Sequence, residues 1–202
     1  MSNNLDFLLE NENVILGDGG ANSISGVASD LAAAAGHGTA VLGYPGSGID
    51  CTPHNAYEID FAHLKEANRY LMRANKNMHR SWPRQQLAQD NALRRDMWLV
   101  RWAHAVYVVG LFTQDASLLK INTDVAWPAQ MYVDRFLFDG EPMALCELYL
   151  FDMKSESWWQ WNGQWNMVSN VPTPTGIYTI LGSDKLTNGA KAALKDLYSI
   201  SQ

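Results

Sequence analysis

Short apolar runs separated by longer amphipathic stretches make up most of this chain. The first apolar run covers Val14 to Leu16 and ends at the glycine turn Gly17-Asp18-Gly19-Gly20. A stretch of small residues, long enough for about three helical turns, then leads to a second apolar run over Ala40 to Leu42. This order of strand, glycine turn, helix and strand predicts a βαβ unit of nearly minimal length.

Two amphipathic stretches predict long helices. Apolar residues recur at helical spacing from Glu58 to Arg80 and again from about Gln85 to Trp102, and Ser81-Trp82-Pro83 separates the two. The predicted buried face of the second helix comprises Leu87, Leu93, Trp98, Leu99 and Trp102. The other non-strand predictions are a lead-in helix over residues 1–12, loops over 50–55 and 114–123, a helix over 124–138 and a linker over 171–175.

Three later apolar runs predict further strands. His104 to Phe112 is almost continuously apolar, which is typical of a strand buried in a parallel sheet. Leu145 to Phe151 is the next, and Gly176 to Leu181 is the last before a helix over about 187–199. Strands and helices therefore alternate almost throughout, which predicts an α/β sandwich with a mostly parallel sheet and with the unit 176–199 completing it.

A tryptophan-rich segment, residues 157–169, predicts a β-hairpin inserted in this pattern. Asn162-Gly163 lies between its two aromatic runs and favours a tight turn, and four of the chain's eight tryptophans fall here. Large aromatic residues at alternating positions favour a core or subunit contact, and a stacking platform for a ligand is the alternative. If the hairpin forms a subunit contact, we expect the protein to be a homo-oligomer.

Composition narrows the possible functions. The chain has 202 residues, enough for one domain with a sizeable core, and its net charge of −6 argues against non-specific nucleic-acid binding. Cys51 and Cys146 have no metal-binding spacing and are expected to be reduced thiols. No apolar stretch is long enough to span a membrane, so we expect a cytoplasmic protein without a membrane partner. The common phosphate-loop, nucleophile-elbow and zinc motifs are missing, and no metal or cofactor is expected.

The same arrangement is predicted three times: a strand followed by a small polar turn and a helix. The turns are Gly19 to Ser23, Asn122 to Asp124, and Gly182 to Lys185. Such turns meet at the carboxyl edge of a parallel sheet, where ligands bind, and a helix N-terminus favours an anion. An ordinary N-capped turn is the alternative interpretation of each. The candidate binding residues are Gly19, Gly20, Asn22, Ser23, Tyr44, Arg84, Arg95, Thr123, Asp124, Trp127, Gly182 and Ser183, with Arg94 as an alternative cation.

Several of these segments resemble the SLOG superfamily, a Rossmann-like group. Gly19-Gly20-Ala21-x-Ser23, Ala35-Gly36-His37 and Tyr44-Pro45 are similar to its G-G-A-x-G-A-D-x-x-A unit, and Arg94-Arg95-Asp96 through Gly110 resembles its R-N … A-D-A-V-Y-A-V-G region. Ala126 to Met131 resembles the helix after its second glycine turn, and Ile180 to Ser183 resembles the G-S-R turn that normally opens the fold. The superfamily includes the Lonely Guy phosphoribohydrolases, the DNA-processing protein A fold and sensors of nucleotide-derived ligands. The resemblance implies a Rossmann-like three-layer sandwich.

This chain departs from the superfamily pattern at motif residues that bear on the superfamily's enzymatic activity. Ile24-Ser25 replaces the Asp of G-A-D, Thr123-Asp124-Val125 replaces G-G-T, and Asp184 replaces the Arg of G-S-R. Tyr44 to Asp50 reproduces only the start of the P-G-G-x-G-T-x-x-E motif that supports glycosidic cleavage. Because the opening strand of the family matches the end of this chain, the resemblance implies a circular permutation. It also implies that binding is retained more fully than catalysis.

The leading hypothesis is a binding protein for a nucleotide-derived small molecule, of the ADP-ribose or cyclic-nucleotide kind. Its phosphates would contact the amides near Gly19 to Ser23, and Tyr44 or Trp127 would stack on a base. A viral or phage sponge that sequesters an immune signalling nucleotide fits a compact chain with few enzyme motifs. The alternative is a nucleotide N-glycosidase using Asp50, Glu58 or Asp124 as its acid. A protein that binds partners through the tryptophan hairpin is the third possibility.

Overall fold

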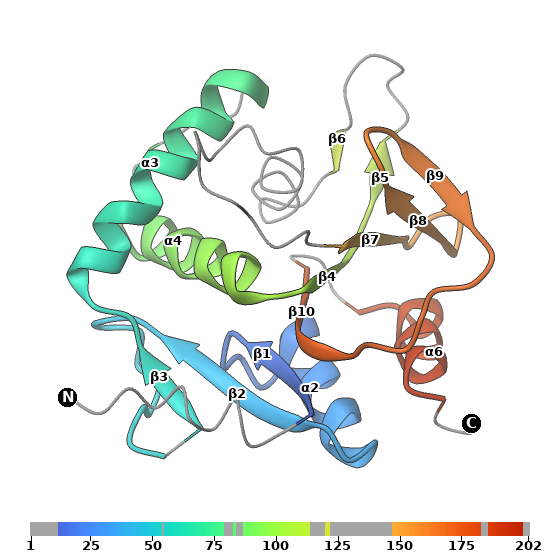
Figure 1. Cartoon of the computed structure of the whole chain (residues 1–202), viewed down its shortest axis with the longest axis horizontal. Helices are drawn as coiled ribbons and strands as arrows, with labels where there is room; N and C mark the ends of the chain where they lie inside the picture. Colours follow the sequence, from blue (N-terminus) through green and yellow to red (C-terminus); the bar gives the residue numbers. More distant parts are fainter. Residues whose placement is uncertain are drawn as a thin grey trace.

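A mixed β-sheet forms the centre of the protein (Figure 1). The structure, a computed structural model, describes residues 12–53, 55–78, 83, 87–113, 120–121, 147–182 and 186–199. The strands of the main sheet lie in the order β3 (Ala56–Glu58), β2 (Gly38–Gly43), β1 (Asn13–Gly17), β10 (Gly176–Leu181), β4 (Ala105–Gly110), β7 (Glu147–Asp152), β8 (Ser157–Trp161) and β9 (Trp165–Val168). Neighbouring strands from β3 to β7 are parallel, and β8 and β9 continue the sheet antiparallel. The predicted α/β fold with a mostly parallel sheet is confirmed.

Helices pack on both faces of this sheet. The helices α3 (Phe61–Met78) and α4 (Leu87–Trp102) contribute to one apolar cluster, and Figure 1 shows them side by side. The helices α2 (Ile24–Ala34) and α6 (Asn188–Leu197) contribute to a second cluster on the other face. Successive residues of a strand point to opposite faces, so Val14 and Leu16 join the first cluster and Ile15 joins the second.

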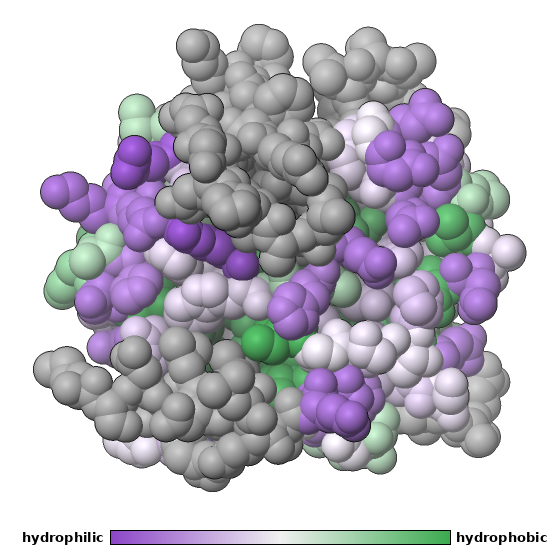
Figure 2. Space-filling model, viewed as in Figure 1, coloured by the Kyte–Doolittle hydropathy of each residue, from purple (hydrophilic) through white to green (hydrophobic). Residues whose placement is uncertain are grey.

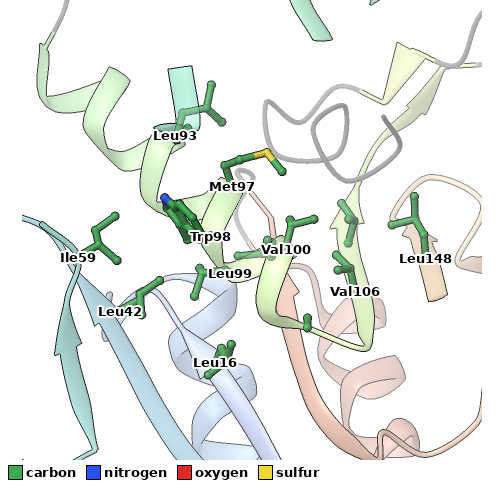
Figure 3. Packing of buried hydrophobic residues seen from close by; sticks show 14 of the residues in the cluster. Leu16, Leu42, Ile59, Leu93, Met97, Trp98, Leu99, Val100, Val106 and Leu148 are labelled. Atoms are coloured by element: carbon green, nitrogen blue, oxygen red, sulfur yellow. The ribbon is translucent and has the colours of Figure 1, made fainter. Parts of the chain in front are cut away.

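The first cluster is dominated by α4. In Figure 3, Trp98 and Leu99 of α4 lie toward the strand residues Leu16 and Leu42. Leu99 is fully buried, and Trp98 also donates a hydrogen bond from Nε1 to the carbonyl of His63 at 3.0 Å. This packing fixes the rotation of α4 about its axis. The residues on the side of α4 that faces the carboxyl edge of the sheet are therefore held in that orientation.

β10 lies in the middle of the sheet, although it is close to the end of the chain. It pairs in parallel with β1 on one side and β4 on the other, and Tyr178, Thr179 and Ile180 are fully buried. This strand is therefore internal and buried on both faces. A circular permutation relative to another family remains a prediction.

Several predicted boundaries were wrong. β3 was not predicted, because its three residues are too few to show a period; Ala56 and Tyr57 had been assigned to no element and Glu58 to the following helix. The strand forms by pairing with β2. Phe112 does not continue β4; it starts β5 (Phe112–Thr113), which pairs antiparallel with β6 (Lys120–Ile121) inside the predicted loop 114–123. Leu87 is 70% exposed because it starts α4, where the helix has not yet reached the core. The predicted helices over residues 1–12 and 124–138 fall on residues of which only Glu12 is described.

The tryptophans of β8 and β9 pack against the two apolar clusters. Trp161 is 8% exposed and belongs to the first cluster, which Trp159 and Trp165 also contact. Trp158 contacts the second cluster and meets Tyr107 edge to face. These contacts fit the core interpretation of the tryptophans better than the stacking platform. On the face seen in Figure 2, the coloured residues are mostly hydrophilic or intermediate, and hydrophobic ones lie scattered among them.

Candidate functional site

The carboxyl ends of the parallel strands meet at one edge of the sheet. β1 ends at Gly17, β2 at Gly43 and β4 at Gly110, and Gly182 follows β10 directly. The N-terminus of α2 packs against this edge: a Cβ on Gly182 would lie 2.6 Å from Ile24 Cδ1 and 2.5 Å from the carbonyl oxygen of Val109. The structure thus brings Gly182 next to the start of α2, and a crevice shared with Gly19 and Gly20 remains a prediction.

The turn between β1 and α2 is organised by the carboxylate of Asp18. Its Oδ1 atom accepts a hydrogen bond from the Gly20 amide at 2.9 Å and lies 3.0 Å from Ser23 Oγ, whose hydroxyl is also 2.7 Å from the carbonyl oxygen of Gly20. Ser23 is the N-cap of α2, and its Oγ accepts from the Gly26 amide at 3.0 Å. The chain's own carboxylate therefore occupies the position at the helix N-terminus where the sequence suggested a phosphate.

Two glycines allow this turn to form. Gly19 has φ of +74°, a conformation that residues with a Cβ rarely adopt. Gly26 lies in the first turn of α2, and a Cβ there would overlap the carbonyl oxygen of Gly20. Ala21 and Asn22 are exposed, as is Gly19 itself, so solvent and small molecules have access to the turn.

Arg95 of α4 reaches this turn from the neighbouring helix. Its Nη1 donates to the carbonyl oxygen of Asp18 at 2.8 Å, and its Nη2 lies 3.9 Å from Asp18 Oδ2. Asp96 holds the same guanidinium, since its Oδ1 accepts from Arg95 Nε at 2.9 Å and lies 2.7 Å from Nη2. The Arg95 side chain is only 9% exposed, so this is a cation held inside the protein by two carboxylates.

Burial and the neighbouring charges shift the pKa values of Arg95 and Asp96 in opposite directions. Burial would lower the pKa of Arg95, but the charges of Asp96 and Asp18 outweigh it and raise that pKa. Burial raises the pKa of Asp96, and the neighbouring Arg95 guanidinium opposes that change. Arg95 is therefore charged at neutral pH, and because it is buried it requires a negative partner.

Tyr44, at the end of β2, completes the group. The Arg95 guanidinium lies 5.9 Å from the centre of the Tyr44 ring, within the range of a cation–π contact. The Tyr44 hydroxyl donates to the carbonyl of Ala88 at the start of α4, at 3.3 Å. We call Asp18, Tyr44, Arg95 and Asp96 the edge cluster. It offers a cation, carboxylate oxygens and an aromatic ring at one edge of the sheet.

The sequence-predicted residues divide into three groups. Gly19, Gly20, Asn22, Ser23, Tyr44, Arg95 and Gly182 lie on elements that meet at this edge, as described above. Arg94, the alternative cation, turns away to the oxygens Oδ1 of Asn68 and Asn91, at 2.8 and 2.6 Å. Arg84, Thr123, Asp124, Trp127 and Ser183 fall outside the described residues.

The candidate acids of the glycosidase alternative gain no support where they are described. Asp50 Oδ1 accepts from the amide and hydroxyl of Thr52, at 2.9 and 2.7 Å, and these bonds lower the pKa of Asp50. Asp50 Oδ1 thus holds the local turn at Thr52, which is a structural role. Glu58 ends β3 and is exposed. Asp124 lies outside the described residues.

Sequence reasoning did not select Asp18 or Asp96. Asp18 stands between two candidate glycines, and an Asp or Asn two residues before a turn amide is a known capping pattern that could have identified it. Asp96 follows Arg95 directly, but adjacent residues on a helix point in different directions, so no local pattern predicts that the two side chains pair. Only the packing of α4 reveals that pair.

Comparison of the chain with family models, with curated proteins and with solved structures found no match. Within the described ranges, no group of three His, Cys, Asp or Glu residues is placed to hold a metal ion. In the same part of the chain, no helix combines the length and apolar character needed to cross a membrane.

Proposed function

We propose that this protein binds a nucleotide-derived small molecule, of the ADP-ribose or cyclic-nucleotide kind, at the carboxyl edge of its sheet. The observation that supports this proposal best is the edge cluster. Arg95 and Asp18 retain hydrogen-bonding atoms that the described residues do not use, next to the ring of Tyr44. Hydrogen-bond donors, an acceptor and an aromatic face are the contacts that a base and a sugar require.

The position of the cluster supports the same proposal. Ligands of open α/β sheets bind outside the carboxyl ends of the strands, and the edge cluster lies at the ends of β1 and β2. The resemblance to the SLOG superfamily adds the expectation of a nucleotide-derived ligand. Sequestration of such a ligand, including a signalling nucleotide, needs no catalytic group and is the activity that we propose.

The first test is to identify what the protein binds. Small molecules released by denaturing the purified protein are analysed by mass spectrometry, and melting is measured with ADP-ribose, AMP and cyclic nucleotides. A ligand at a hundred times its Kd adds about 2.7 kcal/mol, which raises the Tm of a chain of this size by roughly 5–10 °C. No released molecule and no shift across the panel would refute the proposal.

Neighbouring arginines provide a matched pair of variants. Arg95→Lys keeps the charge but loses the planar donor set, and should weaken binding at least about tenfold. Arg94→Lys alters the adjacent residue, whose guanidinium contacts Asn68 and Asn91, and should leave binding unchanged. Equal losses in the two variants would place the ligand elsewhere. Release of free base from AMP by the native protein would establish the glycosidase alternative instead.

A further inference from the structure

The two carboxylate oxygens of Asp18 are used unequally. Oδ1 accepts a hydrogen bond from the Gly20 amide and lies within hydrogen-bonding distance of Ser23 Oγ, whose one hydrogen is shared with the Gly20 carbonyl. Oδ2 lies 3.9 Å from Arg95 Nη2, which is too long for a hydrogen bond, and has no hydrogen-bond partner among the described residues. The Asp18 side chain is 21% exposed, so part of it is in contact with solvent.

The Arg95 guanidinium is also only partly used. It has five N–H donors, and contacts of hydrogen-bonding length to the described residues account for three of them: Nε and Nη2 toward Asp96, and Nη1 toward the Asp18 carbonyl. A donor that is left unpaired in a side chain only 9% exposed is costly. The free donor on Nη2 and the free oxygen of Asp18 lie on the two sides of the 3.9 Å gap.

The carboxylate of Asp18 and the guanidinium of Arg95 limit which chemical group fits between them. The group must accept from a guanidinium and donate to a carboxylate at the same time. A phosphate oxygen only accepts and would be repelled by Asp18, and an ammonium group only donates and would be repelled by Arg95. A hydroxyl does both, and one whose oxygen lies about 2.8 Å from each atom spans such a gap without strain.

We propose that a sugar hydroxyl of the ligand binds between Asp18 Oδ2 and Arg95 Nη2. This inference rests on the proposed function and specifies it: the ribose of the nucleotide-derived molecule, and not a phosphate, contacts the turn between β1 and α2. In the absence of ligand, a water molecule satisfies the same two atoms, and the hydroxyl displaces it.

Asp18→Asn is a sharp test because the turn dictates the orientation of the amide. The Gly20 amide donates to the Oδ1 position, so the oxygen of Asn must take that place. The NH₂ group then takes the position of Oδ2, where it is a donor facing the donors of Arg95. The turn keeps its hydrogen bonds, but the acceptor for the hydroxyl is lost. Asp50→Asn is the matched control, since Asp50 also uses Oδ1 to hold a turn, at Thr52.

The experiment compares ligands that differ by one hydroxyl. Binding of AMP, 2′-deoxy-AMP and 3′-deoxy-AMP is measured by calorimetry, and binding of free D-ribose and 2-deoxy-D-ribose is followed by NMR at the Gly20 amide. One of the deoxy nucleotides should bind native protein about ten- to a hundredfold more weakly than AMP, because a hydrogen bond to charged groups is lost. Asp18→Asn should abolish that preference, and Asp50→Asn should preserve it.

The possible failures are distinguishable. If AMP and the two deoxy nucleotides bind equally well, the sugar contact is refuted but the proposed function is not. The same conclusion follows if Asp18→Asn leaves a preference for AMP intact. Binding of ribose that depends on Asp18, without binding of any nucleotide, supports the sugar contact and refutes the proposed function. If neither nucleotides nor ribose bind, both are refuted and the gap holds water only.

Discussion

Two polar clusters lie at opposite ends of the same parallel sheet, and they are built differently. The edge cluster, at the carboxyl ends, contains a cation and two carboxylates. The tyrosine cluster, toward the amino ends, consists of His37, Tyr178 and Tyr198: His37 Nδ1 lies 2.8 Å from the Tyr178 hydroxyl, which lies 3.1 Å from that of Tyr198. Burial raises the pKa of both tyrosines and lowers that of His37, so all three side chains are neutral at neutral pH.

This difference distinguishes a structural cluster from the binding site that we propose. The Tyr178 hydroxyl bonds to His37 and to the Tyr198 hydroxyl, and Tyr178 is fully buried, so this cluster is complete without a ligand. In the edge cluster, Asp18 Oδ2 and part of the Arg95 guanidinium have no hydrogen-bonding contact with the described residues. Leaving charged groups incompletely paired is costly, and proteins accept that cost mainly at functional sites.

The largest expected effect comes from breaking the charge pair of the edge cluster. Arg95→Met leaves Asp96 buried without its cation and should lower the free energy of unfolding by about 3–5 kcal/mol. The double variant Arg95→Met/Asp96→Asn removes the buried charge as well and should recover more than half of that loss. Urea denaturation measures both. If Arg95→Met were as stable as the native protein, the burial of Asp96 would not depend on its pairing with Arg95.

The next effect tests the backbone of the same cluster. Gly26→Ala places a Cβ against the carbonyl oxygen of Gly20, which cannot move without distorting the Asp18 turn, and should cost about 1–3 kcal/mol. Gly189→Ala is the control, because Gly189 also lies in the first turn of a helix. There the new Cβ meets only the end of the Glu156 side chain, which can rotate away. Comparable Tm losses in the two variants would contradict the close approach at Gly26.

A smaller effect is expected in the tyrosine cluster. Tyr178→Phe removes the hydroxyl between His37 and Tyr198, and should lower the free energy of unfolding by about 1–2 kcal/mol. Ligand binding at the edge cluster should not change, as Tyr178 is not part of it. Thermal melting and calorimetry with the same ligand check the two statements. Loss of binding in this variant would mean that the clusters are coupled.

The smallest effect is a pH dependence in the tyrosine cluster. Burial lowers the pKa of His37 below its usual 6.5, so below that pH the unfolded chain binds a proton more readily than the folded one. Native protein should therefore lose stability as the pH falls from 7.5 to 5.5, relative to His37→Gln, which does not titrate. Tm is measured for both across this range. Parallel pH profiles would show that His37 does not contribute.

Local patterns in the sequence were sufficient to predict the elements whose residues repeat with a clear period. The apolar run of Val14 to Leu16, the small-residue helix α2 and the last strand β10 were all located, because burial on one or both faces dictates their residue types. β3 and β6 were not predicted, since they have three and two residues and form only by pairing with β2 and β5. Such short strands have no pattern of their own.

The sequence by itself determined that this chain forms an α/β protein with a glycine turn between β1 and α2, and the structure assigned the N-cap of α2 to Ser23. Only the tertiary structure decided what that turn holds. Arg95 and Asp18 are separated by 77 positions, and they meet because the apolar face of α4, including Trp98 and Leu99, packs on the sheet and turns Arg95 toward its carboxyl edge. Periodicity reports which face of a helix is apolar, but the partner of a buried charge depends on which elements the fold brings together.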